Sequence, residues 1–139
     1  MTSAAPVLRW SHVALNCRDQ QVTEDFYRRW FAFERARVVP LGEQQIVFLR
    51  QGDVYLELFS AQKAPLLEPQ ADGPAYPGIA RHLAFQTDDL GAFLKRVSGQ
   101  IPVSLGPLQF DDFIPGWRSV WLVDPDGVVV EVSQGYRDA

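Results

Sequence analysis

Apolar and polar residues alternate along residues 9–17, which predicts a half-buried strand. In residues 23–33 the apolar positions recur at helical spacing, and Thr23 is a suitable N-cap. The apolar stripe of this helix consists of Phe26, Tyr27, Trp30 and Phe31. Three more strand-like runs follow at residues 35–41, 44–50 and 54–60. The first half of the chain therefore predicts the order βαβββ.

The second half of the chain repeats this order. Residues 81–87 have the pattern of a strand, and residues 88–99 carry apolar residues at helical spacing before Gly99 ends the segment. Three further strands are predicted at residues 101–110, 118–123 and 128–133, and the turn sequence DPDG joins the last two. The whole pattern predicts an α+β fold made of two tandem βαβββ modules.

A segment rich in proline and glycine separates the two modules. Residues 62–78 contain four prolines and two glycines, so neither a helix nor a central strand is expected there. This linker leaves module 1 at about residues 8–61 and module 2 at about residues 79–135. One module alone would leave an apolar sheet face uncovered, so we expect a single domain over residues 1–139.

Two similar octapeptides open the modules. HVALNCRD begins at His12 and HLAFQTDD begins at His82, and these are the only two histidines in the chain. Alternate residues of a strand share a face, so Trp10 and Asn16 are expected on the face of His12. The alanine two residues after each histidine leaves space beside the imidazole.

One acidic residue interrupts an apolar strand in each module. Glu57 follows His12 by 45 residues (57 − 12), and Glu131 follows His82 by 49 (131 − 82). A carboxylate within an apolar strand needs a partner, and two imidazoles with two carboxylates balance a divalent cation. We therefore predict that these four residues bind one divalent metal ion. Mixed nitrogen and oxygen ligands suit Zn, Ni, Co, Mn or Fe.

Each of these residues also has a simpler interpretation. A histidine in an apolar strand is commonly a hydrogen-bonded core residue, and a single glutamate in a strand can lie on a solvated face. Matched positions in two matched modules are not independent coincidences, and this favours the metal hypothesis.

The register of the hairpins extends the predicted site. If DPDG forms a four-residue turn, Val120 lies opposite Glu131 and Arg118 lies opposite Ser133. Because cross-strand partners share a face, Arg118 would then point into the metal cavity and bind a carboxylate or phosphate of the substrate. A solvated strand end is the alternative for Arg118.

The same reasoning applies to the hairpin of module 1 at Gly52. It places Ile46 opposite Glu57 and Phe48 opposite Tyr55, which predicts an apolar wall for the pocket.

Composition and charge narrow the classes of partner. The chain is 47% hydrophobic and has a formal net charge of −4, which gives no general attraction to nucleic acid or to anionic membranes. No apolar run approaches the ~20 residues that a membrane span needs, and the amino terminus does not have the pattern of a signal peptide. Cys17 is the only cysteine, so no disulfide can form within the chain and a cytoplasmic location is expected.

The duplicated order, together with the segments HVALNCRD, LEL, RHLAFQTDDL and DPDGVVVEV, resembles the vicinal oxygen chelate superfamily over about residues 8–135. That superfamily includes glyoxalase I, methylmalonyl-CoA epimerase, extradiol dioxygenases, fosfomycin-resistance thiol transferases and bleomycin-binding proteins. The resemblance implies an open, eight-stranded, barrel-like sheet around a metal or ligand cavity. It assigns the four ligands to His12, Glu57, His82 and Glu131, a set most similar to that of glyoxalase I.

The resemblance also implies a function. We expect a metal-dependent isomerase or lyase that acts on a small substrate with vicinal oxygens through an enediolate-type intermediate. Glu131 or Glu57 would leave the metal and act as the base. One alternative is an Fe(II) extradiol dioxygenase with His12, His82 and Glu131 as its metal-binding triad. Another is a drug- or metabolite-binding protein without catalysis. The expected partners are a small-molecule substrate and a second copy of the chain in a homodimer.

Overall fold

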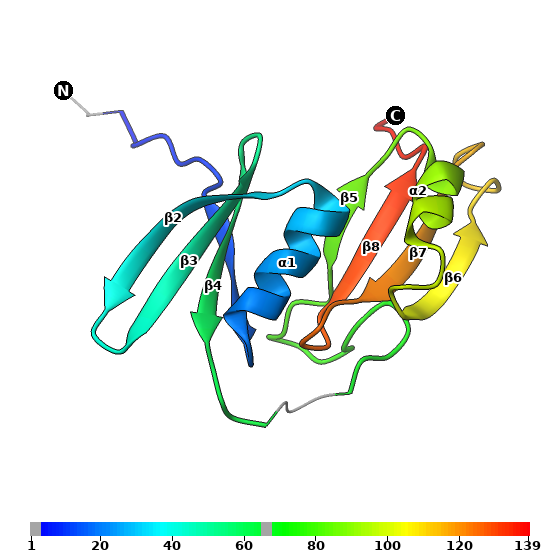
Figure 1. Cartoon of the computed structure of the whole chain (residues 1–139). Helices are drawn as coiled ribbons and strands as arrows, with labels where there is room; N and C mark the ends of the chain where they lie inside the picture. The colour runs from blue at the N-terminus through cyan, green and yellow to red at the C-terminus, as the bar shows by residue number, and fades with distance from the viewer. Residues whose placement is uncertain (1–3, 65–67) are drawn as a thin grey trace. The chain divides into compact units, whose positions relative to one another are not determined.

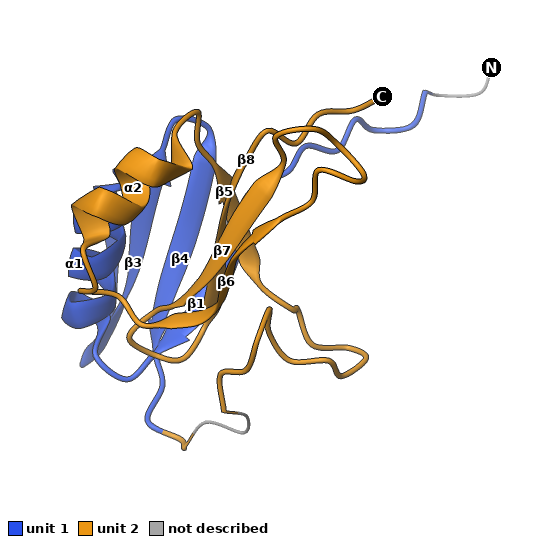
Figure 2. Cartoon of the chain, turned by 90° about the vertical axis from the view of Figure 1, so that its right-hand side faces the viewer, with its two compact units in different colours: residues 1–62 blue, residues 63–139 orange. Residues whose placement is uncertain are grey.

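The computed structural model describes residues 4–64 and 68–139. The chain divides into two compact units, Met1–Gln62 and Lys63–Ala139, which Figure 2 shows in separate colours. Each unit contains one strand, then one helix, then three strands (Figure 1). The expected α+β fold of two βαβββ modules is therefore confirmed.

The first unit forms one four-stranded open sheet with the order β1-β4-β3-β2. β1 runs parallel to β4, and the other neighbours are antiparallel. Its elements are β1 (His12–Cys17), α1 (Gln20–Phe31), β2 (Glu34–Leu41), β3 (Gln44–Gln51) and β4 (Val54–Ser60).

The second unit has the same arrangement, with the order β5-β8-β7-β6 and a parallel β5-β8 pair. Its elements are β5 (Leu83–Gln86), α2 (Leu90–Val97), β6 (Val103–Gln109), β7 (Arg118–Val123) and β8 (Val129–Gln134). The repeat seen in the sequence therefore appears in the structure as two sheets with the same order of strands.

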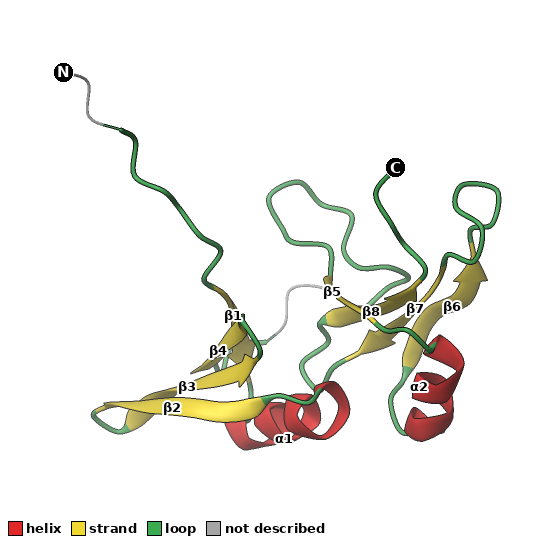
Figure 3. Ribbon diagram, turned by 90° about the horizontal axis from the view of Figure 1, so that it is seen from above, coloured by secondary structure: helices red, strands yellow, loops and turns green. Residues whose placement is uncertain are grey.

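Each helix covers one face of its own sheet (Figure 3). In the first unit, Leu49, Leu56 and Leu58 lie in the core, each at most 2% exposed, whereas the alternate residues Phe48 and Glu57 lie on the other face. This alternation leaves the second face of the sheet for functional side chains.

The core of the second unit is built in the same way. The buried residues on the helix side of β7 and β8 include Val120, Leu122, Val130 and Val132, each at most 2% exposed. Glu131 lies between the last two and therefore on the face away from this core.

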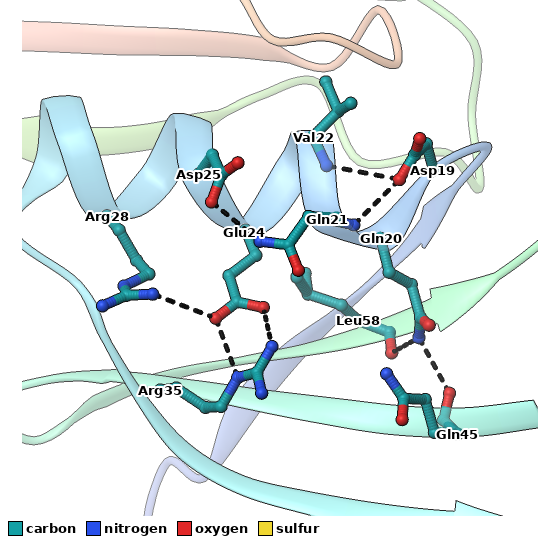
Figure 4. Close-up of polar contacts among 10 residues, drawn as sticks. All are labelled: Asp19, Gln20, Gln21, Val22, Glu24, Asp25, Arg28, Arg35, Gln45 and Leu58. Atoms are coloured by element: carbon teal, nitrogen blue, oxygen red, sulfur yellow. Dashed lines mark hydrogen bonds and ion pairs between the residues drawn. The ribbon is translucent and has the colours of Figure 1, made fainter.

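The first helix begins earlier than the sequence pattern predicts. Asp19, and not Thr23, is its N-cap, and the Asp19 carboxylate accepts from the backbone N–H groups of Gln21 and Val22 (Figure 4). Thr23 lies within the helix and is buried. The Gln20 side chain donates to the carbonyls of Gln45 and Leu58, which ties the first turn to the sheet.

An ion pair between a buried glutamate and a partly exposed arginine joins α1 to β2. The Glu24 carboxylate, 1% exposed, accepts two hydrogen bonds from the Arg35 guanidinium at 2.9 and 2.6 Å (Figure 4). Arg28 lies 3.5 Å from the same carboxylate. The hydrogen bond and the charge of Glu24 raise the pKa of Arg35, so this side chain stays cationic.

No helix in the described ranges 4–64 and 68–139 is long and apolar enough to cross a membrane.

Candidate functional site

His12 and Glu57 form a close pair on the face of the first sheet that α1 leaves free. His12 Nε2 lies 3.2 Å from Glu57 Oε1, and the Glu57 side chain is only 16% exposed. The residue directly opposite Glu57 on the neighbouring strand is Ala14, two positions after the histidine. The small alanine side chain leaves room for the imidazole to reach the carboxylate.

The second unit contains an equivalent pair. His82 Nε2 lies 2.9 Å from Glu131 Oε1, and the Glu131 side chain is 14% exposed. Ala84, again two positions after the histidine, lies directly opposite Glu131. The two pairs therefore occupy the same place in the two modules.

An aromatic residue lies beside each His–Glu pair. Phe48 lies opposite Glu57 on β3, and its ring meets that of His12 edge to face at 5.9 Å. Trp121 lies opposite Glu131 on β7, and its ring is 6.5 Å from that of His82. Each unit thus presents a histidine, a glutamate and an aromatic ring in one constellation.

The hydrogen bond at the other ring nitrogen determines how His82 faces Glu131. His82 Nδ1 lies 2.6 Å from the Asp72 carbonyl oxygen, which can only accept, so Nδ1 carries a proton and donates it. A neutral imidazole then has a lone pair at Nε2, and that lone pair faces a carboxylate oxygen. A cation between the two atoms, either a proton or a metal ion, is what makes this contact favourable.

The hydrogen-bond partner of His12 Nδ1 does not determine which ring nitrogen carries the proton. His12 Nδ1 lies 2.7 Å from the Ser11 hydroxyl, which can either donate or accept. The hydroxyl can therefore accept from Nδ1–H when Nε2 binds a cation.

The two glutamates differ in one contact. The Ser119 hydroxyl, fully buried, donates to Glu131 Oε2 at 2.8 Å. Ser119 precedes Trp121 by two positions, and the residue that precedes Phe48 by two positions is Ile46, which has no hydroxyl. Only the carboxylate of the second unit is therefore held in this way.

The donor atoms suit a divalent ion. Two ligand atoms at right angles, each about 2.1 Å from an ion, are about 3.0 Å apart. The separations of 3.2 and 2.9 Å within the two pairs are close to this value. In the described part of the chain, no three His, Cys, Asp or Glu side chains form a group that could hold a metal ion, so the structure shows two separate His–Glu pairs.

Open pockets adjoin both pairs. The pocket beside His12 has a volume of about 410 Å³ and is lined by Ser11, His12, Ala36, Arg37, Val39, Phe48 and Tyr55. The pocket beside Glu131 has a volume of about 290 Å³ and is lined by Ala84, Phe85, Gln86, Trp117, Glu131, Ser133 and Tyr136. Both combine apolar walls with a few polar groups, as small-molecule sites do.

The expected register of the β7–β8 hairpin is wrong by one residue. Trp121, and not Val120, pairs with Glu131, and Arg118 pairs with Gln134 in place of Ser133. The loop has three residues, because Asp124 and Val128 still pair through their backbones.

This change of register reverses the faces of β7. Val120 is fully buried in the core. Arg118 lies on the same face as Gln134, whose side chain accepts from the first N–H of α2. Both residues therefore lie on the helix side of the sheet, away from Glu131.

The β3–β4 register differs from the expected one by two residues. A shift of two leaves each side chain on the face of the sheet that was expected. Phe48 lies opposite Glu57, and Arg50 lies opposite Tyr55. Ile46 lies two positions from Phe48 and therefore on the same face, opposite Val39 of β2.

Of the residues expected beside His12, Asn16 shares its strand and its face. Trp10 precedes the first residue of β1 and is 78% exposed, so strand alternation does not place it.

Four residues that lie around these pairs were not predicted from the sequence. Ser119 and Trp121 would have been found by allowing for a three-residue loop that ends in a glycine with positive φ, here Gly127 at 92°. Asp72 lies in the segment interpreted as a linker, and its contact uses the backbone. Arg37 reaches the pocket through a bulge that has no local signal in the sequence.

Comparison with known proteins agrees with this architecture. A glyoxalase family protein from Enterococcus faecalis is 32% identical, with 90% of this chain and 96% of that chain covered and a TM-score of 0.67. The fosfomycin resistance protein FosX from Listeria monocytogenes is 16% identical, with 94% of each chain covered and a TM-score of 0.72. A glutamate-to-glutamine mutant of that FosX, complexed with Mn(II) and 1S,2S-dihydroxypropylphosphonic acid, has a TM-score of 0.70, an identity of 16%, and coverage of 94% of this chain and 93% of that one.

No curated protein matched the chain significantly. The family model described as the Glyoxalase/Bleomycin resistance protein/Dioxygenase superfamily matches residues 9–132, nearly the whole chain. The protein therefore belongs to the glyoxalase/bleomycin resistance protein/dioxygenase superfamily.

Proposed function

We propose that this protein is a divalent-metal-dependent enzyme of the glyoxalase-like group, an isomerase or lyase that acts on a small substrate with vicinal oxygens. The observation that carries the proposal is the pair of equivalent His–Glu contacts, at 3.2 Å in the first unit and 2.9 Å in the second. Two partly buried carboxylates that each face a histidine nitrogen have the composition of a cation site.

The proposed ion takes both pairs as ligands. One pair supplies only two protein ligands, whereas stable sites of this kind have three or four. His12, Glu57, His82 and Glu131 together provide four donors and two negative charges, which balance a divalent ion. Mn(II) in the complex of the FosX mutant supports a divalent ion, and Zn, Ni, Co and Fe suit the same donors.

The bound ion would polarise two neighbouring oxygens of the substrate and stabilise negative charge on them. The chain supplies the proton transfer: the carboxylate of Glu57 or Glu131 takes the proton from the carbon beside the carbonyl, which yields an enediolate-type intermediate, and returns it to the neighbouring carbon. Phe48 and Trp121 flank the two pairs.

Metal stoichiometry tests the shared site. We expect about one ion per chain by elemental analysis after equilibration with Mn, Co, Ni or Zn. His12→Gln and His82→Gln should each weaken binding of that ion by more than the ~10–100-fold that loss of an outer hydrogen-bond partner costs. The matched control is Glu43→Gln, on an exposed turn. Two ions per chain, each lost with one histidine, would contradict the shared site.

Turnover tests the reaction. The metal-loaded protein should isomerise adducts of α-ketoaldehydes with thiols, and loss of the glutamate that acts as the base should lower the rate by about 10²–10⁴-fold. Unchanged turnover in both Glu57→Gln and Glu131→Gln would contradict the proposed proton transfer.

A second candidate is an Fe(II) extradiol dioxygenase that uses His12, His82 and Glu131. The observation that favours it is the hydrogen bond from Ser119, which holds Glu131 but has no equivalent at Glu57. Oxygen uptake with catechols would identify this activity. Tight binding of such compounds without turnover would indicate a sequestering protein.

We also propose a cytoplasmic location and a homodimeric assembly. The single cysteine, Cys17, is buried in the core, which suits a reducing cytoplasm. A homodimer is proposed from the superfamily, and sedimentation of the metal-loaded protein tests it.

A further inference from the structure

A β-bulge turns two nearby arginines of β2 to opposite faces of the sheet. Arg35 pairs with Leu49 and Arg37 pairs with Phe48, so the two residues of β2 are matched by neighbouring residues of β3. Ala36 is the extra residue between them. Residues two apart in a regular strand share a face, but here the bulge places Arg35 on the core side and Arg37 on the side of Glu57.

The two guanidinium groups have different surroundings. Arg35 is bound by the buried carboxylate of Glu24. Arg37 lines the pocket that also contains His12. Within residues 4–64 and 68–139, no hydrogen bond or ion pair involves the Arg37 guanidinium. Arg37 is therefore a cation available to a ligand.

The register places Arg37 close to the proposed metal ligands. Arg37 lies opposite Phe48, and Phe48 lies opposite Glu57, so the three residues form one row across the sheet. With strands about 4.8 Å apart, the backbones of Arg37 and Glu57 are about 10 Å apart, a gap that a long arginine side chain can largely span. A ligand that reaches both must be small.

The charge of the site also favours an anion. A divalent ion with two glutamates is neutral overall, and Arg37 then adds one positive charge. The chain as a whole carries −4, so an anionic ligand gains nothing from the rest of the surface. Val39, Phe48 and Tyr55 give the pocket apolar walls, and a charged hydrogen bond beside such walls is stronger than one in bulk water.

We propose that Arg37 binds a carboxylate or phosphate group of the substrate, so that the protein acts on small anionic molecules whose charged group lies a few bonds from two vicinal oxygens. This inference rests on the proposed function for the position of the vicinal oxygens. The guanidinium would form paired hydrogen bonds to the oxyanion, a geometry that lysine does not reproduce.

The first experiment uses three hydroxyketones that share vicinal oxygens and differ in charge. Dihydroxyacetone, hydroxypyruvate and dihydroxyacetone phosphate are titrated into the metal-loaded protein by calorimetry. We expect the two anions to bind about 10- to 100-fold more tightly than dihydroxyacetone, the range of a charged hydrogen bond. Arg37→Gln should remove this preference, and Arg37→Lys should restore part of it. The stronger of the two anions identifies the group as phosphate or carboxylate.

Arg118→Gln is the matched control, because this arginine lies on the helix side of its sheet and should leave the preference unchanged. If Arg37→Gln keeps the full preference for the anions, or if wild type shows none, the assignment of Arg37 is wrong.

The second experiment separates this inference from the metal proposal. Inorganic phosphate is titrated into the metal-free protein with chelator present, and the Nε–H signal of Arg37, identified by its loss in Arg37→Gln, is followed by NMR. A saturable shift of that signal supports the anion site even if no metal binds. No shift of that signal overturns the inference, whereas failure of the metal proposal would appear as absent metal binding in wild type.

Discussion

The Ser119 hydroxyl donates a 2.8 Å hydrogen bond to Oε2 of Glu131, and this bond leaves Oε1 directed at His82. We expect Ser119→Ala to weaken metal binding by about 10-fold, because outer hydrogen bonds orient a metal-binding carboxylate. Competition with a chelator of known affinity measures this. Ser133→Ala is the control, because the Ser133 hydroxyl accepts from Trp117 instead. Equal losses in the two variants would argue against a specific role for Ser119.

The difference between Ser119 and Ile46 makes the two glutamates unequal. Ser119 holds Glu131 in place, so Glu57 would have more freedom to leave the proposed ion and move a proton. We therefore expect Glu131→Gln to lower metal affinity more, and Glu57→Gln to lower turnover more at saturating metal, by about 10²–10⁴-fold. Rates measured against metal concentration separate the two effects. The reverse pattern would make Glu131 the base.

Gly73 follows Asp72, whose carbonyl oxygen contacts His82 Nδ1. The φ of Gly73 is +120°, and a Cβ there would lie 1.8 Å from the Arg81 carbonyl oxygen, so Gly73→Ala must move the loop. The neighbouring Asp72 carbonyl would then lose its bond to His82 Nδ1. We expect metal affinity to fall by about 10–100-fold.

The control for this prediction is Gly78→Ala. Gly78 also has a positive φ, +86°, but a Cβ there meets nothing within 4 Å. Long-range ¹⁵N NMR of the imidazoles shows whether His82 keeps its proton at Nδ1. Preservation of that signal in Gly73→Ala, together with normal affinity, would contradict the proposed role of the loop.

The Glu24–Arg35 pair should contribute to stability and not to the site. Arg35→Met leaves a buried carboxylate with only Arg28 at 3.5 Å, and we expect the free energy of unfolding to fall by about 3 kcal/mol. Arg37→Met, on the same strand but on the other face, should change it by less than about 0.5 kcal/mol. Urea unfolding measures both. Similar losses in the two variants would show that the bulge does not separate their roles.

The elements of the fold could be predicted because their signals are local. The period of apolar residues changes from two to about 3.6 at the two helices, and the repeated order showed the duplication. The two histidines and two glutamates were recognised as pairs because each occupies the same position in its module. The structure brings His12 to Glu57 and His82 to Glu131 within their units.

Residues beside these pairs depended on pairing between strands, which has no local signal. A loop of three residues in place of four exchanged Ser119 and Trp121 for Arg118 and Val120, because a shift of one residue reverses every face of a strand. On β3, a shift of two left the faces unchanged.

The sequence alone determined the two βαβββ modules and the four chemically distinctive residues, since periodicity and repetition can be read along the chain. Only the tertiary structure decided what surrounds them. The bulge at Ala36 exists only in the pairing of β2 with β3, and the carbonyl of Asp72 reaches His82 only because the loop folds back. The bulge and the carbonyl contact both depend on backbone geometry, which the identities of the residues do not specify.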